Sequence, residues 1–125
     1  MRDYSQHIHY AQSLSPKAYT ATTNGATVDT SGFDSITLDF NFGVITDGTH
    51  TPSVQDSPDG STWTAVAANF LVGALVNGVS ATIQKVGYIG GNRYVRAITT
   101  VAGATTGGVY SATAVLGHSD MAPVS

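Results

Sequence analysis

The sequence predicts an all-β domain, an antiparallel sandwich of about eight short strands. Extended segments with alternating apolar and polar residues recur along the 125-residue chain. Turn-forming Gly, Asn, Asp and Pro separate them at intervals of about 8–12 residues, as in sandwiches and barrels. The composition favours strands, with 17 Thr, 14 Gly and no Glu. Because no strand–helix alternation is visible, a parallel sheet is not expected.

The expected strands in the first half of the chain are bounded by turn signals. They cover residues 18–23, 26–29, 35–41 and 53–56. Asn24-Gly25 predicts a hairpin turn between the first two, because both residues tolerate positive φ. The third strand is the clearest, since Ile36, Leu38 and Phe40 alternate with polar residues and should form its buried side.

The second half continues in the same way. Its expected strands cover residues 62–67, 80–86, 93–101 and 109–116. Residues 57–60, Ser-Pro-Asp-Gly, predict a tight turn before the first of them. In the strand 93–101, alternation should place one set of side chains on one side and the rest on the other: Val95, Ala97, Thr99 and Val101 against Tyr94, Arg96, Ile98 and Thr100. Residues 69–76 fit either one helical turn or a buried strand.

The chain length fits one domain with a core of its own. The sandwich is expected over residues 18–117, because residues 1–17 are polar and aperiodic and indicate an N-terminal arm, and 118–125 a polar tail. The arm carries side chains that we expect to contact a neighbouring subunit: Tyr4, His7, Ile8, His9 and Tyr10.

Charge and cysteine content exclude several classes of function. Charged residues make up 10% of the chain, the net charge is −3 and the five basic residues are scattered. Nucleic acid and anionic membranes are therefore not expected partners, since both are bound by clustered Lys and Arg. The absence of cysteine excludes disulfides and thiolate chemistry. No run of 18 apolar residues and no secretory signal is visible.

The sequence offers no catalytic or cofactor motif. It lacks a nucleophile elbow and the glycine-rich phosphate loops, and its eight Asp without Glu single out no pair of carboxylates. We therefore expect neither an enzyme nor a cofactor. Residues 55–66 lack calcium ligands at the first and last positions of the loop pattern. His7 and His9, with Asp3 nearby, offer metal ligands, but nothing in the arm would hold them in place, so no metal is expected.

Two groups of residues leave alternatives open. The aromatic rings either stack on a sugar or, as is more common in sandwiches, pack in or beside the core: Trp63, Tyr88, Tyr94 and Tyr110. Arg93 and Arg96 either protect a strand edge or pair with an Asp of a neighbouring subunit. A surface made mainly of Thr, Ser, Ala and Gly, with few charges, separates lone monomers poorly. We therefore expect a homo-oligomer, a dimer or a trimer.

Four segments carry a resemblance to a known group of proteins: SPDGSTW at 57–63, YIGGNRYVR at 88–96, GGVYSA at 107–112 and VLG at 115–117. Over residues 16–125 the chain resembles small structural proteins of tailed bacteriophages, which are capsid decoration (cement) proteins or related head components. The resemblance implies a jelly-roll-like sandwich that binds the major capsid protein on the exterior of the virion head. It would act as an oligomer that bridges capsomers, without catalysis or cofactor.

Two other assignments remain open. The Asp-Gly-Ser-x-Trp motif at 59–63 followed by Arg-Tyr-Val-Arg at 93–96 is also similar to discoidin-like carbohydrate-binding sandwiches. The pair of cysteines common in those domains is missing here. A subunit of a head fibre or of the tail would share the same fold.

Overall fold

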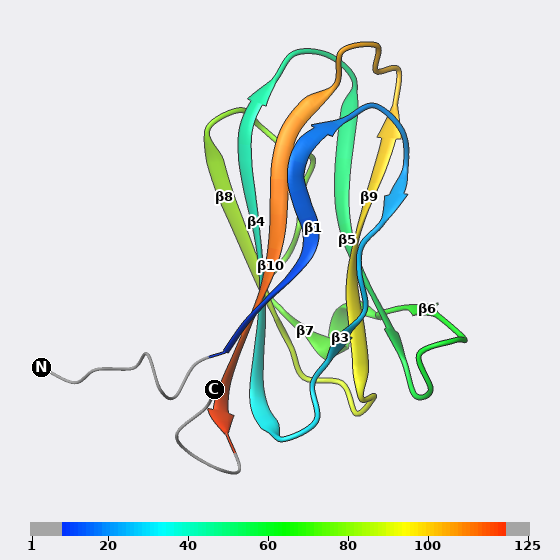
Figure 1. The fold of residues 1–125 in the computed structure, drawn as a ribbon, viewed down its shortest axis with the longest axis vertical. Coiled ribbons are helices and arrows are strands. Elements are labelled where there is room, and N and C mark those ends of the chain that lie inside the picture. Colours follow the sequence, from blue (N-terminus) through cyan, green and yellow to red (C-terminus); the bar gives the residue numbers. More distant parts are fainter. Residues whose placement is uncertain (1–8, 120–125) are drawn as a thin grey trace, which may run out of the picture.

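Two five-stranded antiparallel sheets form the fold in the computed structural model, which describes residues 9–119 (Figure 1). Sheet A has, in spatial order, β1 (His9–Tyr19), β10 (Gly108–Ser119), β4 (Phe33–Ile45), β8 (Thr82–Tyr88) and β7 (Leu71–Val72). Sheet B has β2 (Thr23–Asn24), β9 (Tyr94–Ala102), β5 (Thr49–Ser57) and β6 (Thr64–Ala65), and β3 (Val28–Asp29) also pairs with β9. The predicted all-β sandwich is confirmed.

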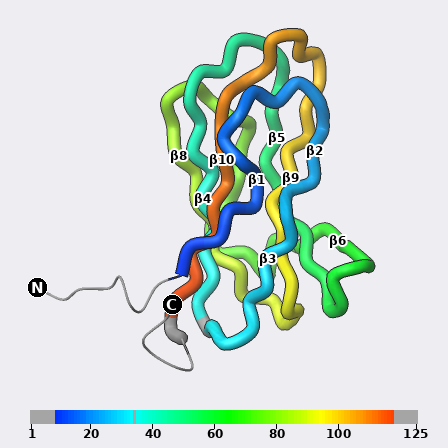
Figure 2. The backbone as a smooth tube through the Cα atoms, viewed as in Figure 1, coloured from blue at the N-terminus to red at the C-terminus, as the bar shows by residue number. Residues whose placement is uncertain are grey.

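The chain passes repeatedly from one sheet to the other. Strands β1, β4, β8 and β10 belong to sheet A, whereas β2, β3, β5 and β9, which lie between them in the sequence, belong to sheet B (Figure 2). The first strand pairs with the last, β1 with β10. One short 3-10 helix, η1 (Ala68–Phe70), precedes β7. Within the described residues, no helix has the length and apolar character needed to cross a membrane.

The core lies between the sheets and follows the predicted alternation. Leu38 and Phe40 of β4 are fully buried, and Val95 and Ala97 of β9 face them from sheet B. Ile36 is partly buried and packs against the same cluster. Tyr94 and Arg96 alternate with these buried residues, so they lie on the outer side of sheet B.

A chain of buried polar groups closes the core near the upper end of the sandwich. His50 is 1% exposed, its Nδ1 lies 2.9 Å from the hydroxyl of Tyr110, and its Nε2 lies 2.9 Å from the carbonyl oxygen of Asp47. The carbonyl can only accept, so Nε2 carries the proton and Nδ1 accepts the Tyr110 O–H. Thr99 bonds to the same hydroxyl. Tyr110 is therefore a core residue, which removes it from the sugar platform considered above.

The expected N-terminal arm is wrong for residues 9–17. They form most of β1, which pairs with β10 from His9 to Tyr19. The register shifts between Gln12 and Leu14 and again between Leu14 and Lys17. Each bulge changes the side to which the following side chains point, so the two-residue period disappears from the sequence. The expected tail also begins later, since β10 continues to Ser119.

The hairpin expected at Asn24-Gly25 is also wrong. Asn24 ends β2, and Gly25 does not have positive φ. Gly25 instead lies between β2 and β3 of sheet B, close to Ser13 of β1, and its N–H donates to the carbonyl of Ala97. A Cβ at Gly25 would lie 2.4 Å from Ser13 Oγ and 2.5 Å from the Ala97 carbonyl oxygen. Glycine is needed here for close approach rather than for a turn.

The other predicted elements differ mainly in length. Residues 69–76 combine both alternatives, since the helical turn of η1 leads into the two residues of β7. The strand expected at 62–67 is reduced to β6, whereas those expected at 53–56 and 35–41 extend into β5 and β4. The turn at 57–60 is confirmed: Ser57 Oγ accepts from the N–H groups of Asp59 and Gly60, and Gly60 has φ of 81°.

Candidate interaction surface

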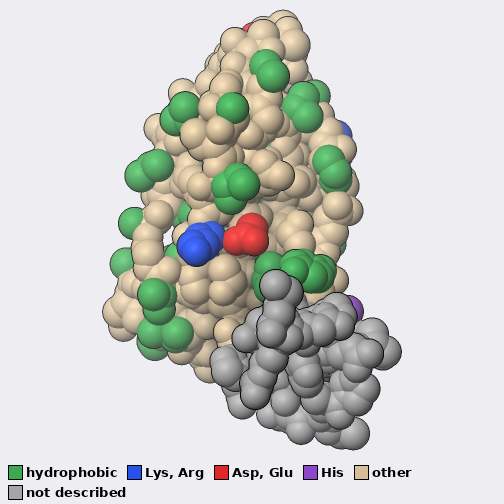
Figure 3. Space-filling view, turned by 90° about the vertical axis from the view of Figure 1, so that its left-hand side faces the viewer, with side chains coloured by type: hydrophobic (Ala, Val, Ile, Leu, Met, Phe, Trp, Pro, Cys, Tyr) green, Lys and Arg blue, Asp and Glu red, His purple; other side chains and the backbone are tan. Residues whose placement is uncertain are grey.

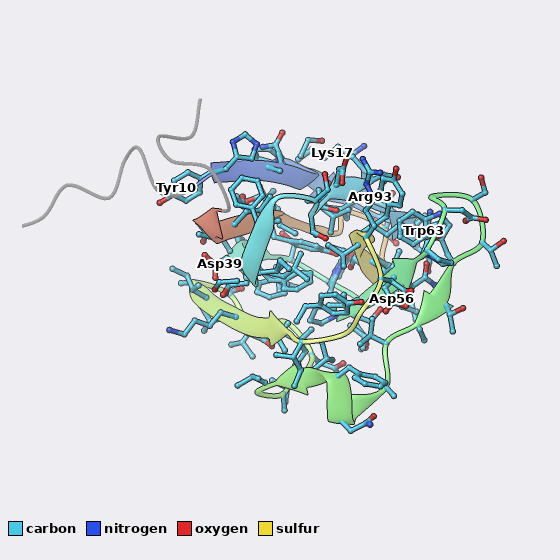
Figure 4. The ribbon with its side chains drawn as sticks, turned by 90° about the horizontal axis from the view of Figure 1, so that it is seen from below. Tyr10, Lys17, Asp39, Asp56, Trp63 and Arg93 are labelled. Atoms are coloured by element: carbon cyan, nitrogen blue, oxygen red, sulfur yellow. The ribbon has the colours of Figure 1, made fainter. Side chains whose placement is uncertain are left out.

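The outer side of sheet B carries a group of aromatic and guanidinium side chains beside the turn at 57–60. We call Trp63, Arg93, Tyr94 and Arg96, with Gln55, the arginine–aromatic cluster. Tyr94 and Arg96 lie on β9, Gln55 lies opposite Arg96 on β5, and Trp63 follows the turn. Figure 4 shows Trp63 and Arg93 on the sheet B side of the molecule, away from Tyr10 and Asp39.

Arg96 is held in place by an aromatic ring and an amide. Its guanidinium carbon lies 4.2 Å from the centre of the Trp63 ring, within the range of a cation–π contact. Its Nε and Nη2 donate to Gln55 Oε1 over 3.0 and 2.7 Å. Among the side chains that the structure describes, those of residues 9–33 and 35–117, no carboxylate forms a salt bridge with it. Partial burial lowers the pKa of Arg96, but an arginine stays charged at neutral pH, so this positive charge is ordered and not neutralised.

Arg93 has an acidic partner in its own chain. Its Nε and Nη2 donate to the two carboxylate oxygens of Asp29 over 2.9 and 2.8 Å. These bonds hold the pKa of Asp29 well below its usual range and raise that of Arg93. Arg93 also lies 5.1 Å from the centre of the Tyr94 ring. Because Nε and Nη2 of Arg93 are already bonded to Asp29, a two-bond pairing with an Asp of another subunit through these atoms would require this ion pair to open.

The turn at 57–60 holds two aromatic rings of the cluster, Trp63 and Tyr94, in position. Asp59 Oδ1 accepts from the N–H groups of Ser61 and Thr62 over 2.8 and 2.9 Å, and these bonds lower the pKa of Asp59. The segment that leads to Trp63 is thereby fixed. The open side of Gly60 faces the Tyr94 ring, and a Cβ there would lie 3.7 Å from Tyr94 Cδ2. The turn chemistry visible in the sequence therefore positions both rings.

A shallow cleft opens beside this cluster, between the loop at 30–33 and the loop at 88–93. Its volume is about 540 Å³, and its lining combines apolar and polar groups: Thr30, Ser31, Phe33, Ile36, Tyr88, Ile89, Gly90, Gly91, Asn92 and Arg93. The Tyr88 hydroxyl donates to Asp56 Oδ2 over 2.6 Å and accepts from the Asn92 N–H over 3.1 Å. Burial, together with the Asp56 carboxylate, raises the pKa of Tyr88 to about 12.

The four rings of the sugar hypothesis do not form one surface. Tyr88 and Tyr110 are 3% and 2% exposed and belong to the core. Trp63 and Tyr94 are half-buried on the outer side of sheet B, each beside an arginine. Tyr88 and Tyr110 therefore pack in the core, whereas Trp63 and Tyr94 belong to the arginine–aromatic cluster.

The outer side of sheet A is poor in charge. Alternation places on it Gln12, Ser35, Thr37, Asp39, Asn41, Val72, Ile83, Lys85, Gly87, Val109, Ser111, Thr113 and Val115. Asp39 and Lys85 are direct cross-strand partners of β4 and β8. Figure 3 shows this face, with one acidic and one basic side chain next to each other at its middle and single apolar side chains scattered around them.

The predicted interface residues of the arm fall into two groups. Tyr4, His7 and Ile8 lie outside the described residues, as does Asp3. Tyr10 is 65% exposed on β1, and the His9 ring stacks on Phe33 with centroids 5.8 Å apart. Among the side chains of residues 9–33 and 35–117, no three His or Asp gather in a way that would hold a metal ion.

Three residues of these two surfaces were not predicted as functional candidates from the sequence: Gln55, Asp39 and Lys85. Gln55 holds Arg96 across a strand pair, 41 residues away in the sequence. The acidic and basic partners become neighbours only through the register of β4 and β8. An alternation analysis of both strands could have placed each on the outer side, but not opposite each other.

Comparison of the chain with protein-family models, with curated proteins and with solved structures finds no match.

Proposed function

We propose that this chain is a structural protein of a tailed-phage virion, a decoration protein that binds the major capsid protein on the exterior of the assembled head as a homo-oligomer. Its work is binding rather than catalysis. The observation that carries the proposal is the arginine–aromatic cluster, in which Arg96 is ordered between Trp63 and Gln55 without a neutralising acid. The sequence resemblance to phage head proteins names the partner.

The cluster has the chemistry of a protein-binding surface. Trp, Tyr and Arg dominate the binding energy of most protein interfaces. The Arg96 side chain is already held by Gln55 and Trp63, so little conformational entropy is lost when a partner binds. A carboxylate or a backbone carbonyl of the shell is the acceptor that such a guanidinium favours.

The fold supports the same proposal. The chain passes repeatedly between the two sheets, and the first strand pairs with the last, which is compatible with the jelly-roll arrangement that the resemblance implies. An oligomer that contacts several shell subunits gains about 10²–10⁴ in avidity over a single contact. Bridging of neighbouring capsomers would then resist rupture of a filled head.

Co-sedimentation with assembled, DNA-free shells of the major capsid protein tests the proposal. We expect the wild-type chain to pellet with the shells, and Trp63→Ala or Arg96→Met to raise the Kd about ten-fold to a hundred-fold, as hot-spot substitutions do. Thr100→Ala is the matched control, because Thr100 lies exposed on the outer side of β9. Circular dichroism verifies that each variant is folded.

Two results would contradict the proposal. A wild-type chain that never pellets with shells removes the function. Variants that pellet as well as the wild type remove the cluster as the docking surface, and with it the observation on which the proposal depends. Electron microscopy of the particle separates decoration, which needs many symmetric copies, from a head-fibre or tail subunit at a single vertex.

A carbohydrate-binding module is the second candidate, and the cleft between the loops at 30–33 and 88–93 favours it. The cleft joins the apolar side chains of Phe33, Ile36 and Ile89 to the polar Asn92, a combination suited to a sugar ring. A glycan array tests it. Binding that is lost in Asn92→Ala, without shell binding by the wild type, would support this candidate over the first.

A further inference from the structure

The outer side of sheet A matches a second copy of itself, and we propose that two copies of this chain associate through it, face to face, about a two-fold axis. The inference deepens the proposed function, on which it rests, by naming the surface that forms the homo-oligomer. It uses the side of the molecule opposite the arginine–aromatic cluster, so both clusters of the dimer stay uncovered.

The two charges on this side are opposite in sign and lie on adjacent strands. Asp39 of β4 and Lys85 of β8 are direct register partners. Lys85 is exposed and Asp39 half-buried. Neither side chain forms a salt bridge with any side chain of residues 9–33 and 35–117, so within this part of the chain both charged groups are available to a partner. Two copies of a surface with charges of one sign would repel each other. This surface carries one negative and one positive side chain, so two copies can meet without that repulsion.

A two-fold axis parallel to the strands, passing between β4 and β8, exchanges the two strands. Asp39 of each copy then faces Lys85 of the other, and two equivalent ion pairs form. The neighbouring row of the sheet contains Val115, Thr37, Gly87 and Val72 in spatial order. The same operation places Val115 opposite Val72, 60% exposed in the monomer, and Thr37 opposite Gly87. In these two rows charge meets opposite charge, apolar meets apolar and the smallest residue meets a short one, whereas in the third row the same operation places the exposed Ile83 opposite Asn41.

Shape and area fit this arrangement. Short side chains around the charged pair allow two sheets to approach to the usual spacing of about 10 Å. The overlap of β10, β4, β8 and β7 about this axis covers roughly 300 Å² of sheet per copy at standard strand spacings, which fits a weak, concentration-dependent dimer rather than a permanent one. The neutral balance of the surface disfavours nucleic acid or a charged membrane as the occupant.

Sedimentation-velocity ultracentrifugation of the full chain, without shells, tests the proposal. We expect a concentration-dependent dimer. Asp39→Lys and Lys85→Asp should each raise the dimer Kd by about ten-fold or more, because like charges then face each other across the axis. An equimolar mixture of the two variants should recover a one-to-one dimer, since each lysine pair then meets an aspartate pair. Lys17→Asp is the control, because Lys17 is exposed on β1, outside the overlap.

The mixture separates a contact between copies from a merely structural role within one copy, which mixing cannot restore. A wild-type chain that stays monomeric up to about 100 µM, a range in which weak dimers are populated, overturns the proposal. So does a trimer, or a dimer that both reversals leave intact. Because no shell is present, a failure here leaves the co-sedimentation result standing, and loss of shell binding by a dimeric wild type affects the proposed function alone.

Discussion

At the scale of single residues, burial and hydrogen-bond partners together set the pKa values of the ionisable groups of this protein. Tyr88 illustrates it, because its hydroxyl donates to Asp56 and accepts from the Asn92 N–H. Burial of the ring is the main cause of its high pKa, and the Asp56 carboxylate adds to it. The phenol must stay protonated to keep the bond to Asp56.

We expect Tyr88 to titrate near pH 12, against an ordinary tyrosine value of 10.0. Absorbance at 295 nm, compared between the wild type and Tyr88→Phe, isolates its titration. Asp56→Asn should lower the pKa of Tyr88, because it removes the negative acceptor. Since the folded value exceeds the unfolded one, the contribution of Tyr88 to stability is complete below pH 10 and declines as pH rises toward 12. A Tyr88 that titrates at its ordinary value would contradict its burial, and an Asp56→Asn variant that leaves the pKa of Tyr88 unchanged would contradict the bond to Asp56.

At the scale of the elements, the strands inside the sheets could be predicted and the edge strand could not. β4 pairs over much of its length with β10 and β8, and β9 pairs over its whole length with β5. The alternation of apolar residues therefore places Leu38 and Val95 in the core, although Ile98 of β9 is also buried, on the side opposite to Val95. β1 is an edge strand whose two bulges interrupt the alternation. Its membership of sheet A is decided by pairing with residues some hundred positions away, which no local pattern records.

One part of the arginine–aromatic cluster could likewise be predicted from local sequence, and the other part depends on strand pairing. The turn at 57–60 was predictable, because Ser, Pro, Asp and Gly encode it locally. The contact of Arg96 with Trp63 and Gln55 joins three elements. Its residues could be nominated from their types, but their arrangement depends on the register of β9 against β5.

Gly25 gives an element-scale prediction, since it lies between β2 and β3 of sheet B in close contact with Ser13 of β1, a strand of sheet A. We expect Gly25→Ala to lower the free energy of unfolding by about 1–3 kcal/mol, the usual cost of overpacking, because the new Cβ would overlap Ser13 and the carbonyl of Ala97. Gly91→Ala is the matched control: nothing lies within 4 Å of its Cβ position, so a change within about 0.5 kcal/mol is expected. Urea unfolding measures both. Equal effects would contradict the close approach.

At the scale of the whole molecule, the acidic residues fasten loops. Asp47 accepts from the N–H groups of Gly107, Thr106 and Thr105, and these bonds lower its pKa. It thereby ties the loop before β5 to the loop before β10. Backbone N–H groups lower the pKa of Asp59 in the same way, whereas the pKa of Asp29 is lowered first by its hydrogen bonds from Arg93 and then by the Ser31 N–H. A protein with ten per cent charged residues has few surface ion pairs, so its carboxylates act mainly through backbone N–H groups.

This arrangement predicts how stability depends on pH. A carboxylate whose pKa is lower in the folded state stabilises the fold above its unfolded value of about 3.9, and that contribution is lost as pH falls through the folded value. The urea midpoint should therefore be constant from pH 7 to 5 and decline below about pH 4. Asp47→Asn should lower the midpoint at pH 7, and its difference from the wild type should shrink in acid. Lys17→Gln, which removes an exposed charge that does not titrate in this range, should differ from the wild type by the same amount at every acidic pH. A difference between Asp47→Asn and the wild type that persists unchanged at pH 2 would mean that Asp47 contributes through its shape rather than through its charge.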